Sequence, residues 1–214
     1  MDITQLILDD HHEQRRLFSI IEQIAAADTE SLAAVWGRLS TFLEVHAAAE
    51  EKIFYPELLR VGLSAAGGGS ADTAEAETLD AIHDHNDIRD TIAAVAGHPV
   101  GSSDWLAAIA AVNVANGDHM AEEEREGLTD FRRRASLQLR HDLAVAFADF
   151  EARNYTGVAP VDRDPETYVH DEELGIPRSP RLVGPAGTTA PDRSGSTSPS
   201  PDGSLNIGSL RGAP

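Results

Sequence analysis

One set of short histidine motifs occurs twice in this chain, and the repeat restricts the fold more than any other feature of the sequence. Each copy begins with an Asp-His step and continues with a His-x-x-x-Glu-Glu segment, 35 residues later in the first copy and 34 in the second. The copies are Asp10-His11 with His46-x-x-x-Glu50-Glu51, and Asp84-His85 with His119-x-x-x-Glu123-Glu124. Two matching helical hairpins packed about a pseudo-twofold axis would bring four histidines and two glutamates to one level of a bundle.

Helical phase separates the members of each doublet. Apolar side chains around the motifs recur every three or four positions, which is typical of amphipathic helices. Counting 3.6 residues per turn places six candidate ligands on the apolar stripes, namely His11, His46, Glu50, His85, His119 and Glu123. We expect Glu51, Glu122 and Glu124 on a solvated face, with Glu124 as the alternative to Glu123. The remaining histidines, His12, His83, His98, His141 and His170, are expected on the surface or in loops.

The first part of the chain is predicted to be helical throughout. Breaker-rich segments divide it into helices at about 3–26, 28–60, 72–96, 105–126 and 130–153. Asp72-x-x-Glu75 resembles a capping box that would open the third helix. The sequence therefore predicts an all-α fold, an antiparallel up-down four-helix bundle with an additional C-terminal helix.

The composition changes after Asn154, where Pro, Gly and Ser become frequent. Such a segment buries too little apolar surface to offset the entropy lost on ordering. We therefore predict a helical domain over 1–155 and an extended tail over 156–214, disordered or docked on the surface. Short apolar pieces that are candidates for docking are Tyr168-Val169, Leu182-Val183 and Leu205–Ile207.

Charge and cysteine content exclude several classes of protein. The formal net charge of −19 argues against nucleic-acid binding, because phosphate would be repelled. The chain has no cysteine, so thiolate metal sites and cysteine nucleophiles are excluded. No basic and apolar leader is visible, and no apolar run approaches the ~18 residues that span a bilayer. We expect a cytoplasmic protein without nucleic-acid or membrane partners, monomeric by default.

The inward set of side chains favours a dinuclear metal site. A His and a Glu at i and i+4 lie one above the other on a helix, so both reach the bundle axis. Burying these groups is costly unless cations compensate them. The spacing differs from the Glu-x-x-His pattern of ferritin-like proteins. Zinc and manganese also suit imidazole and carboxylate ligands, so the residues alone leave the metal open.

Residues 1 to about 155 resemble the hemerythrin HHE cation-binding domain. The matching pieces are Asp10-His11, His46-x-x-x-Glu50-Glu51 followed by Phe54-Tyr55-Pro56, His85, and His119-x-x-x-Glu123-Glu124. The resemblance implies two iron ions with an oxo or hydroxo bridge. It also implies that Glu50 and Glu123 bridge the ions and that His11, His46, His85 and His119 are terminal ligands.

The chain departs from the oxygen carriers of this family at one position. A typical carrier has a second histidine one turn after the ligand on the third helix, and Arg89 stands there. The missing histidine leaves an additional coordination position for water, a side chain or a small molecule. Tyr55 is a candidate for it, because Pro56 disrupts the helix and can create a bulge that turns Tyr55 inward.

The additional position favours reaction with hydrogen peroxide, nitric oxide or dioxygen over reversible oxygen carriage. We therefore predict a diiron protein that reacts with these small oxidants, as a catalase-like or nitric-oxide-consuming enzyme. The alternative is a module that binds or senses oxygen, nitric oxide or iron without turnover.

Overall fold

The computed structural model describes residues 1–64 and 69–175, and this part of the chain contains helices and no strand. The four longest helices supply the body of the fold, and shorter ones follow α2 and α5. In chain order they are α1 (Ile3–Gln23), α2 (Thr29–Ala49), the π-helical turn η1 (Glu50–Phe54), α3 (Tyr55–Ser64), α4 (Gly69–Val95), α5 (Ser103–Arg125), α6 (Gly127–Arg134), α7 (Leu137–Asn154) and α8 (Pro165–Glu173). The predicted all-α class is confirmed.

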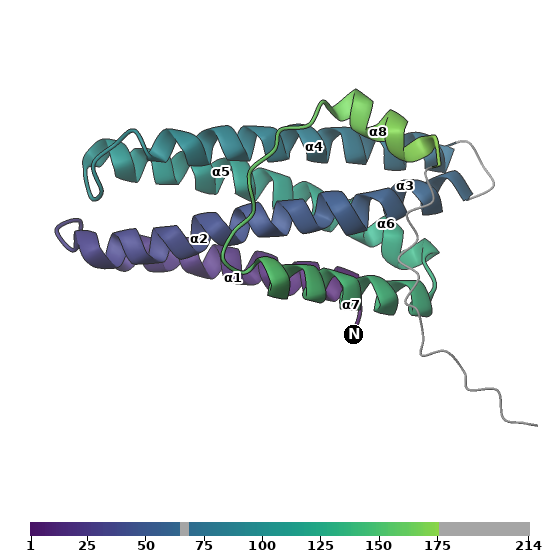
Figure 1. The fold of residues 1–214 in the computed structure, drawn as a ribbon, viewed down its shortest axis with the longest axis horizontal. Helices are drawn as coiled ribbons and strands as arrows, with labels where there is room; N and C mark the ends of the chain where they lie inside the picture. Colours follow the sequence, from purple (N-terminus) through teal and green to yellow (C-terminus); the bar gives the residue numbers. More distant parts are fainter. Residues whose placement is uncertain (65–68, 176–214) are drawn as a thin grey trace, which may run out of the picture. The chain divides into compact units, whose positions relative to one another are not determined.

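The four long helices lie side by side, and the chain reverses direction between consecutive ones (Figure 1). Contacts join α1 to α2, α2 to α4, α4 to α5 and α5 to α1, so each helix has two neighbours in a closed ring. The turn between α1 and α2 and the turn between α4 and α5 lie at the same end of the bundle. There Gly101 has a positive φ of 79°, and a Cβ on it would collide with the carbonyl oxygen of Ala26.

Side-chain caps set several helix starts, and some of the predicted boundaries are wrong. Asp28 and Ser102 accept hydrogen bonds from amides in the first turns of α2 and α5. α4 begins at Gly69, so Asp72 lies inside the helix and does not open it. The predicted fifth helix is two helices, because Ser136 interrupts it and caps α7 through the amide of Leu139.

The bulge expected beside Pro56 is present as η1. The amide of Tyr55 donates to the carbonyl of Glu50, five residues back, instead of to the usual i−4 carbonyl. One extra residue in the turn changes the helical phase, so Tyr55 shares a face with Glu50. The predicted second helix is therefore divided into α2, η1 and α3.

Two apolar clusters form the core, and the repeated motifs lie between them. One cluster, which includes Ile7, Phe54 and Phe147, packs α1, α3, α6 and α7 together. The other, which includes Phe18 and Trp105, fills the end near the hairpin turns. Along α1, His11 follows Ile7 and precedes Leu17 and Phe18, so a polar layer separates the two clusters.

The segment after α7 crosses the bundle to α8, which packs against α4 and α3 (Figure 1). Tyr168 and Val169 of α8 are buried, as the docking of this apolar piece requires. The other two docking candidates, at 182–183 and 205–207, lie outside the described residues.

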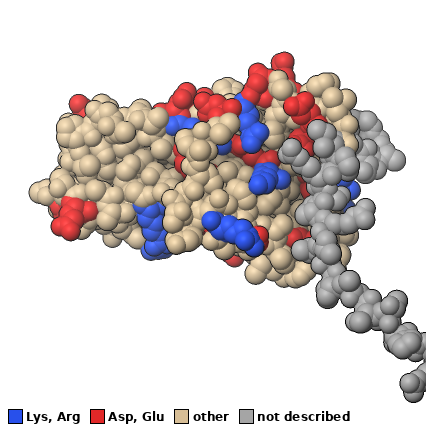
Figure 2. All heavy atoms as spheres, viewed as in Figure 1, with Lys and Arg blue, Asp and Glu red and all other residues tan. Residues whose placement is uncertain are grey.

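The surface is acidic in places, as the net charge requires. Figure 2 shows carboxylates gathered over α4 and α8 on one face. Among the described residues, no helix is both long enough and apolar enough to cross a membrane.

Candidate metal centre

The structure brings the six inward residues of the repeat together in the polar layer. Each of them is buried, and each of the four long helices or its immediate extension contributes at least one. The set is His11 on α1, His46 on α2, Glu50 on η1, His85 on α4, and His119 and Glu123 on α5. Their side chains form two groups that share Glu50.

The first group, called here the His11 position, consists of His11, His46 and Glu50. Nε2 of His46 lies 3.0 Å from Oε1 of Glu50, and Nε2 of His11 lies 4.0 Å from the same oxygen. Two imidazole nitrogens and one carboxylate oxygen therefore face a common point. The i, i+4 spacing of His46 and Glu50 produces this arrangement at the end of α2.

The second group, the His85 position, consists of His85, His119 and Glu50. Nε2 of His85 lies 3.3 Å from Oε2 of Glu50, the oxygen that does not face His46. Nε2 of His119 lies 3.1 Å from Nε2 of His85. The two oxygens of Glu50 thus face different histidine pairs, which is the arrangement of a bridging carboxylate.

Glu123 and Tyr55 complete the inner layer. Oε2 of Glu123 lies 3.4 Å from Nε2 of His11, although Glu123 belongs to neither group of three. Its other oxygen accepts a 3.0 Å hydrogen bond from the Tyr55 hydroxyl. Tyr55 is buried and its ring lies against His85, so the π-helical turn has brought it into the centre.

A carboxylate lies beside the Nδ1 atom of every histidine in the centre. These outer carboxylates come from the residue before or after an inner residue of the motif. The pairs are His11 with Glu124 at 2.9 Å, His46 with Asp10 at 3.2 Å, His85 with Glu51 at 3.0 Å, and His119 with Asp84 at 3.5 Å. A carboxylate on one ring nitrogen orients the imidazole and directs the other nitrogen inward, as in many metal sites.

The repeat extends to two arginines behind these carboxylates. Arg15 Nη1 lies 2.8 Å from Oε1 of Glu124, and Arg89 Nη2 lies 2.5 Å from Oε1 of Glu51. Two chains thus run from arginine through glutamate to histidine, and in each the arginine and the histidine come from one hairpin and the glutamate from the other. Arg89, at the position where an oxygen carrier has a ligand, holds an outer carboxylate instead.

The expectation that Glu51 lies on a solvated face is wrong. Its side chain is 3 % exposed, whereas that of Glu124 is 28 % exposed. The wide turn of η1 directs Glu50 toward the bundle axis and Glu51 toward His85, so both members of the doublet are buried. Glu124 is half-covered and contacts the outer nitrogen of His11, a place that differs from that of a ligand.

The two inward carboxyl groups have opposite pKa shifts. Burial alone would raise the pKa of Glu50, but His46 and His85 outweigh it and hold that pKa well below its usual value. Burial and the charge of Glu50 raise the pKa of Glu123 well above its usual value. Burial likewise lowers the pKa of His11 to about 4, which keeps its imidazole neutral and able to bind a cation.

The donor atoms fit a pair of cations. Eleven buried side-chain nitrogen and oxygen atoms of the described residues have no hydrogen-bond partner, and five of them lie together in the inner layer: Nε2 of His11, Nε2 of His46, both carboxylate oxygens of Glu50 and Oε2 of Glu123. Buried polar atoms are normally paired, because leaving one unpaired costs about 1–3 kcal/mol. Iron, zinc or manganese bound by these nitrogens and oxygens would satisfy them.

Sequence reasoning missed one acid beside the centre. Glu151 of α7 lies with Asp10 and His46 in a third group of potential ligands. Burial and the charge of Asp10 raise the pKa of Glu151 to about 8. Glu151 lies outside the repeat, so no pattern in the sequence indicated it. The roles of Asp10 and Asp84 did have a signal, since an aspartate precedes the histidine in both copies.

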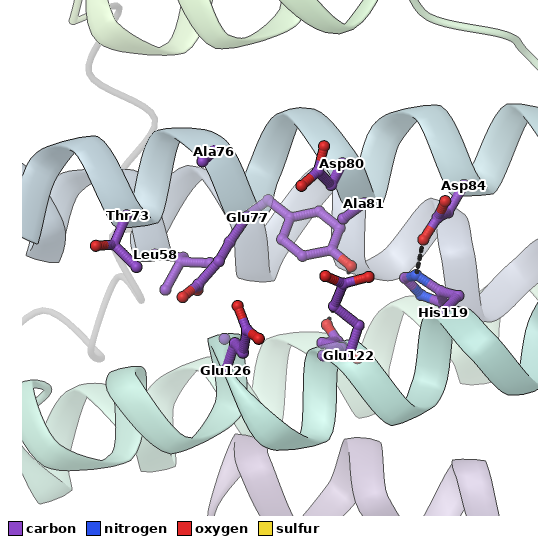
Figure 3. A pocket seen from close by; sticks show the side chains of 13 residues that line it. Leu58, Thr73, Ala76, Glu77, Asp80, Ala81, Asp84, His119, Glu122 and Glu126 are labelled. Carbon is purple, nitrogen blue, oxygen red and sulfur yellow. Dashed lines mark hydrogen bonds and ion pairs between the residues drawn. The ribbon is translucent and has the colours of Figure 1, made fainter.

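A pocket of about 90 Å³ adjoins the centre between α4 and α5 (Figure 3). Its buried wall includes Tyr55, His119 and Glu123. Its more exposed wall carries Glu77, Asp80, Asp84, Glu122 and Glu126. Figure 3 shows Asp84 reaching His119 across the space between the two helices. The pocket therefore links the solvent to the inner layer through a carboxylate-lined opening.

The five remaining histidines, His12, His83, His98, His141 and His170, are exposed, as predicted.

Residues 2–128 match the family described as the hemerythrin HHE cation binding domain. No curated protein and no solved structure matches the chain.

Proposed function

The chain belongs to the hemerythrin HHE cation-binding family, and from this premise we propose that it is a non-haem diiron protein that reacts with hydrogen peroxide, nitric oxide or dioxygen. The observation that carries the proposal is the set of five buried, unpartnered donor atoms that face one another in the polar layer. A fold that buries these atoms without cations would be destabilised by each of them.

The proposed ligands are the six inward residues. His11 and His46 would hold one ion, His85 and His119 would hold the other, and Glu50 would reach both because its oxygens face different pairs. Glu123 is the second shared carboxylate, with Oε2 directed at His11. Bound iron would supply the electron transfer to and from a small oxidant, while the protein controls coordination and access.

The outer carboxylates hold the four imidazoles in place for this role. Asp10, Glu51 and Glu124 each accept a hydrogen bond from Nδ1, which fixes the tautomer with its free electron pair on Nε2, and Asp84 lies 3.5 Å from Nδ1 of His119. The two apolar clusters border the polar layer on either side and reduce its contact with bulk water. In such surroundings the charges of the ligands act on a bound molecule more strongly than in water.

Tyr55 is proposed to hold a proton at the centre. Its hydroxyl donates to Oε1 of Glu123 and faces the pocket. Burial and the charges of Glu123 and Glu50 raise the pKa of Tyr55 well above its usual value, which favours the neutral phenol. Reduction of peroxide or dioxygen consumes protons, and Tyr55 is positioned to deliver one. A phenolate ligand is the other role for Tyr55, and an optical spectrum distinguishes the two.

The pocket between α4 and α5 is the proposed route for the substrate. Its carboxylates, which include Asp80 and Glu122, repel anions and leave neutral molecules unhindered. Hydrogen peroxide, nitric oxide and dioxygen are small and neutral. Ferrous ions entering during metal loading would be attracted to the same opening.

Metal analysis and a peroxide assay test the proposal. Purified protein reconstituted with ferrous iron should contain two irons per chain and have near-ultraviolet bands of a coupled ferric pair. Disproportionation of hydrogen peroxide needs no added electron donor, so oxygen release on adding peroxide measures turnover directly. A protein that takes up no iron under these conditions would contradict the proposal, whereas tighter binding of zinc would not, because divalent zinc binds most nitrogen and oxygen sites more tightly than ferrous iron. Two irons with a ligand-dependent spectrum, but without turnover of peroxide or nitric oxide, would favour the binding or sensing module.

A further inference from the structure

A segment beyond the family-matched residues contacts one side of the centre. It is called here the clamp segment and comprises residues 163–168. Nε of Arg163 lies 2.7 Å from Oε2 of Glu51, and the Tyr168 hydroxyl donates a 2.5 Å hydrogen bond to the carbonyl of Glu51. The backbone of Arg163 also exchanges two hydrogen bonds with the side chain of Asn86, at 2.7 and 3.1 Å.

The residues that the clamp segment holds stand next to two proposed ligands. Asn86 follows His85 on α4, and Glu51 follows Glu50 on η1. Glu51 also receives the Nδ1 atom of His85, so Arg163 is linked to that ligand through one carboxylate. Glu51 and Asn86 would have to move when His85 swings away from a bound ion, and both are hydrogen-bonded to the clamp segment.

The repeat-related side of the centre is held differently. Among the described residues, His11 and Arg15 are hydrogen-bonded to the carboxylate of Glu124, and the Thr129 hydroxyl donates to the backbone carbonyl of Glu124. Arg15 is 39 % exposed, whereas Arg89 is 7 % exposed and buried beside Glu51. His12, which corresponds to Asn86 in the repeat, is exposed. Solvent therefore reaches Glu124, the outer carboxylate of His11, more easily than Glu51, the outer carboxylate of His85. The clamp segment acts on the Glu51 side only, and Asp84 beside His119 is 35 % exposed.

We propose that the clamp segment makes the two metal positions unequal, so that the ion at the His85 position is released more slowly than the ion at the His11 position. This inference rests on the proposed two-ion centre. Release of an ion to a chelator requires its ligands to swing away, and immobilised outer groups slow that motion. Removing one outer partner of a metal ligand commonly changes metal affinity about 10- to 100-fold.

Release of cobalt(II) to an excess of chelator tests the clamp. Cobalt has visible absorption in such sites and avoids iron oxidation. The full-length wild type, loaded with two cobalt ions, should lose them in two phases of unequal rate. Arg163→Gln should accelerate the slow phase about tenfold and leave the fast phase unchanged. Arg15→Gln should accelerate the fast phase and leave the slow one. His46→Ala, which removes a ligand of the His11 position, should retain only the slow phase.

Arg153→Gln is the matched control, because Arg153 is an exposed arginine of the same region whose partner is Asp149. It should leave both phases unchanged. Asn86→Ala removes the two hydrogen bonds between the Asn86 side chain and the backbone of Arg163. If Arg163→Gln folds poorly, Asn86→Ala replaces it in the test and is expected to accelerate the slow phase in the same way. Two ions released in a single phase, or an Arg163→Gln variant that alters both phases equally, would refute the clamp alone. Fewer than two ions in the wild type would refute the diiron proposal and the clamp with it.

Discussion

The Nδ1 atom of His11 lies 2.9 Å from Oε1 of Glu124, so a carboxylate of α5 sets the orientation of an imidazole of α1. Glu124→Gln keeps the shape of the side chain but weakens this contact. We expect metal affinity at the His11 position to fall about 10- to 100-fold. Competitive titration with a chromophoric chelator measures the change. Glu22→Gln, which changes an exposed acid outside the pocket lining, is the control, and equal effects of the two variants would contradict the assigned role.

Glu50 belongs to both metal positions, so we expect a Glu50 variant to lose more metal than a variant of a ligand that belongs to only one position. His119→Ala removes one nitrogen from the His85 position and should leave about one ion per chain. Glu50→Ala removes an oxygen from both positions and should leave almost none. Elemental analysis of purified protein gives the stoichiometry, with His83→Ala as the control because His83 is exposed on α4. One ion retained by Glu50→Ala would show that Glu50 serves a single position.

The inner layer of the centre could be predicted because it obeys a helical period. His11, His46 and His85 share stripes with apolar residues, and a repeat of motifs places those stripes at one level. The period also gives the correct side for exposed residues such as His83. Regular helices preserve phase over many turns, so residue counting is reliable within them.

The remaining features depend on irregular backbone or on contacts between distant segments. Glu51 was misplaced because η1 adds a residue to the turn, and the phase count assumes a regular helix. Arg163 and Glu151 reach the centre from segments that the repeat does not include. Loop paths and tertiary packing decide such contacts, and neither has a period that a sequence reveals.

Tyr55 is predicted to act through its proton. Iron-loaded Tyr55→Phe should contain the same amount of iron as the wild type, because the phenol bonds to Glu123 and is not required to hold an ion. Peroxide turnover should fall about 100-fold, the size of effect expected for a lost proton donor. A strong visible phenolate-to-iron band in the wild type that is missing from the variant would instead identify Tyr55 as a ligand.

The carboxylates of the pocket are predicted to exclude anions. In the double variant Asp80→Asn, Glu122→Gln, azide should bind the iron-loaded centre several-fold faster than in the wild type at low salt. The difference should shrink at 1 M salt, where charges are screened beyond about 3 Å. The rate with hydrogen peroxide should not change, since it is neutral. The control carries Glu22→Gln and Glu30→Gln, two exposed acids outside the pocket lining. Equal acceleration in the control would show a general charge effect.

Glu77 of the same pocket is predicted to make stability depend on pH. Burial and the charges of Asp130 and Glu126 raise its pKa from 4.5 to about 7. Between these two values the folded state binds more protons than the unfolded state, so this group's contribution to stability falls as the pH rises and is constant above about 7.

Glu77→Gln removes this titration. The variant should match the wild type near pH 4 and become more stable by ~1–2 kcal/mol above pH 7, a figure reduced for the partial exposure of the group. Urea unfolding of the metal-free protein at a series of pH values measures the difference. Glu75→Gln makes the same change of charge on the exposed face of α4 and serves as the control. Parallel pH profiles for Glu77→Gln and the wild type would mean that Glu77 ionises normally, and the pocket would then be more negative at neutral pH.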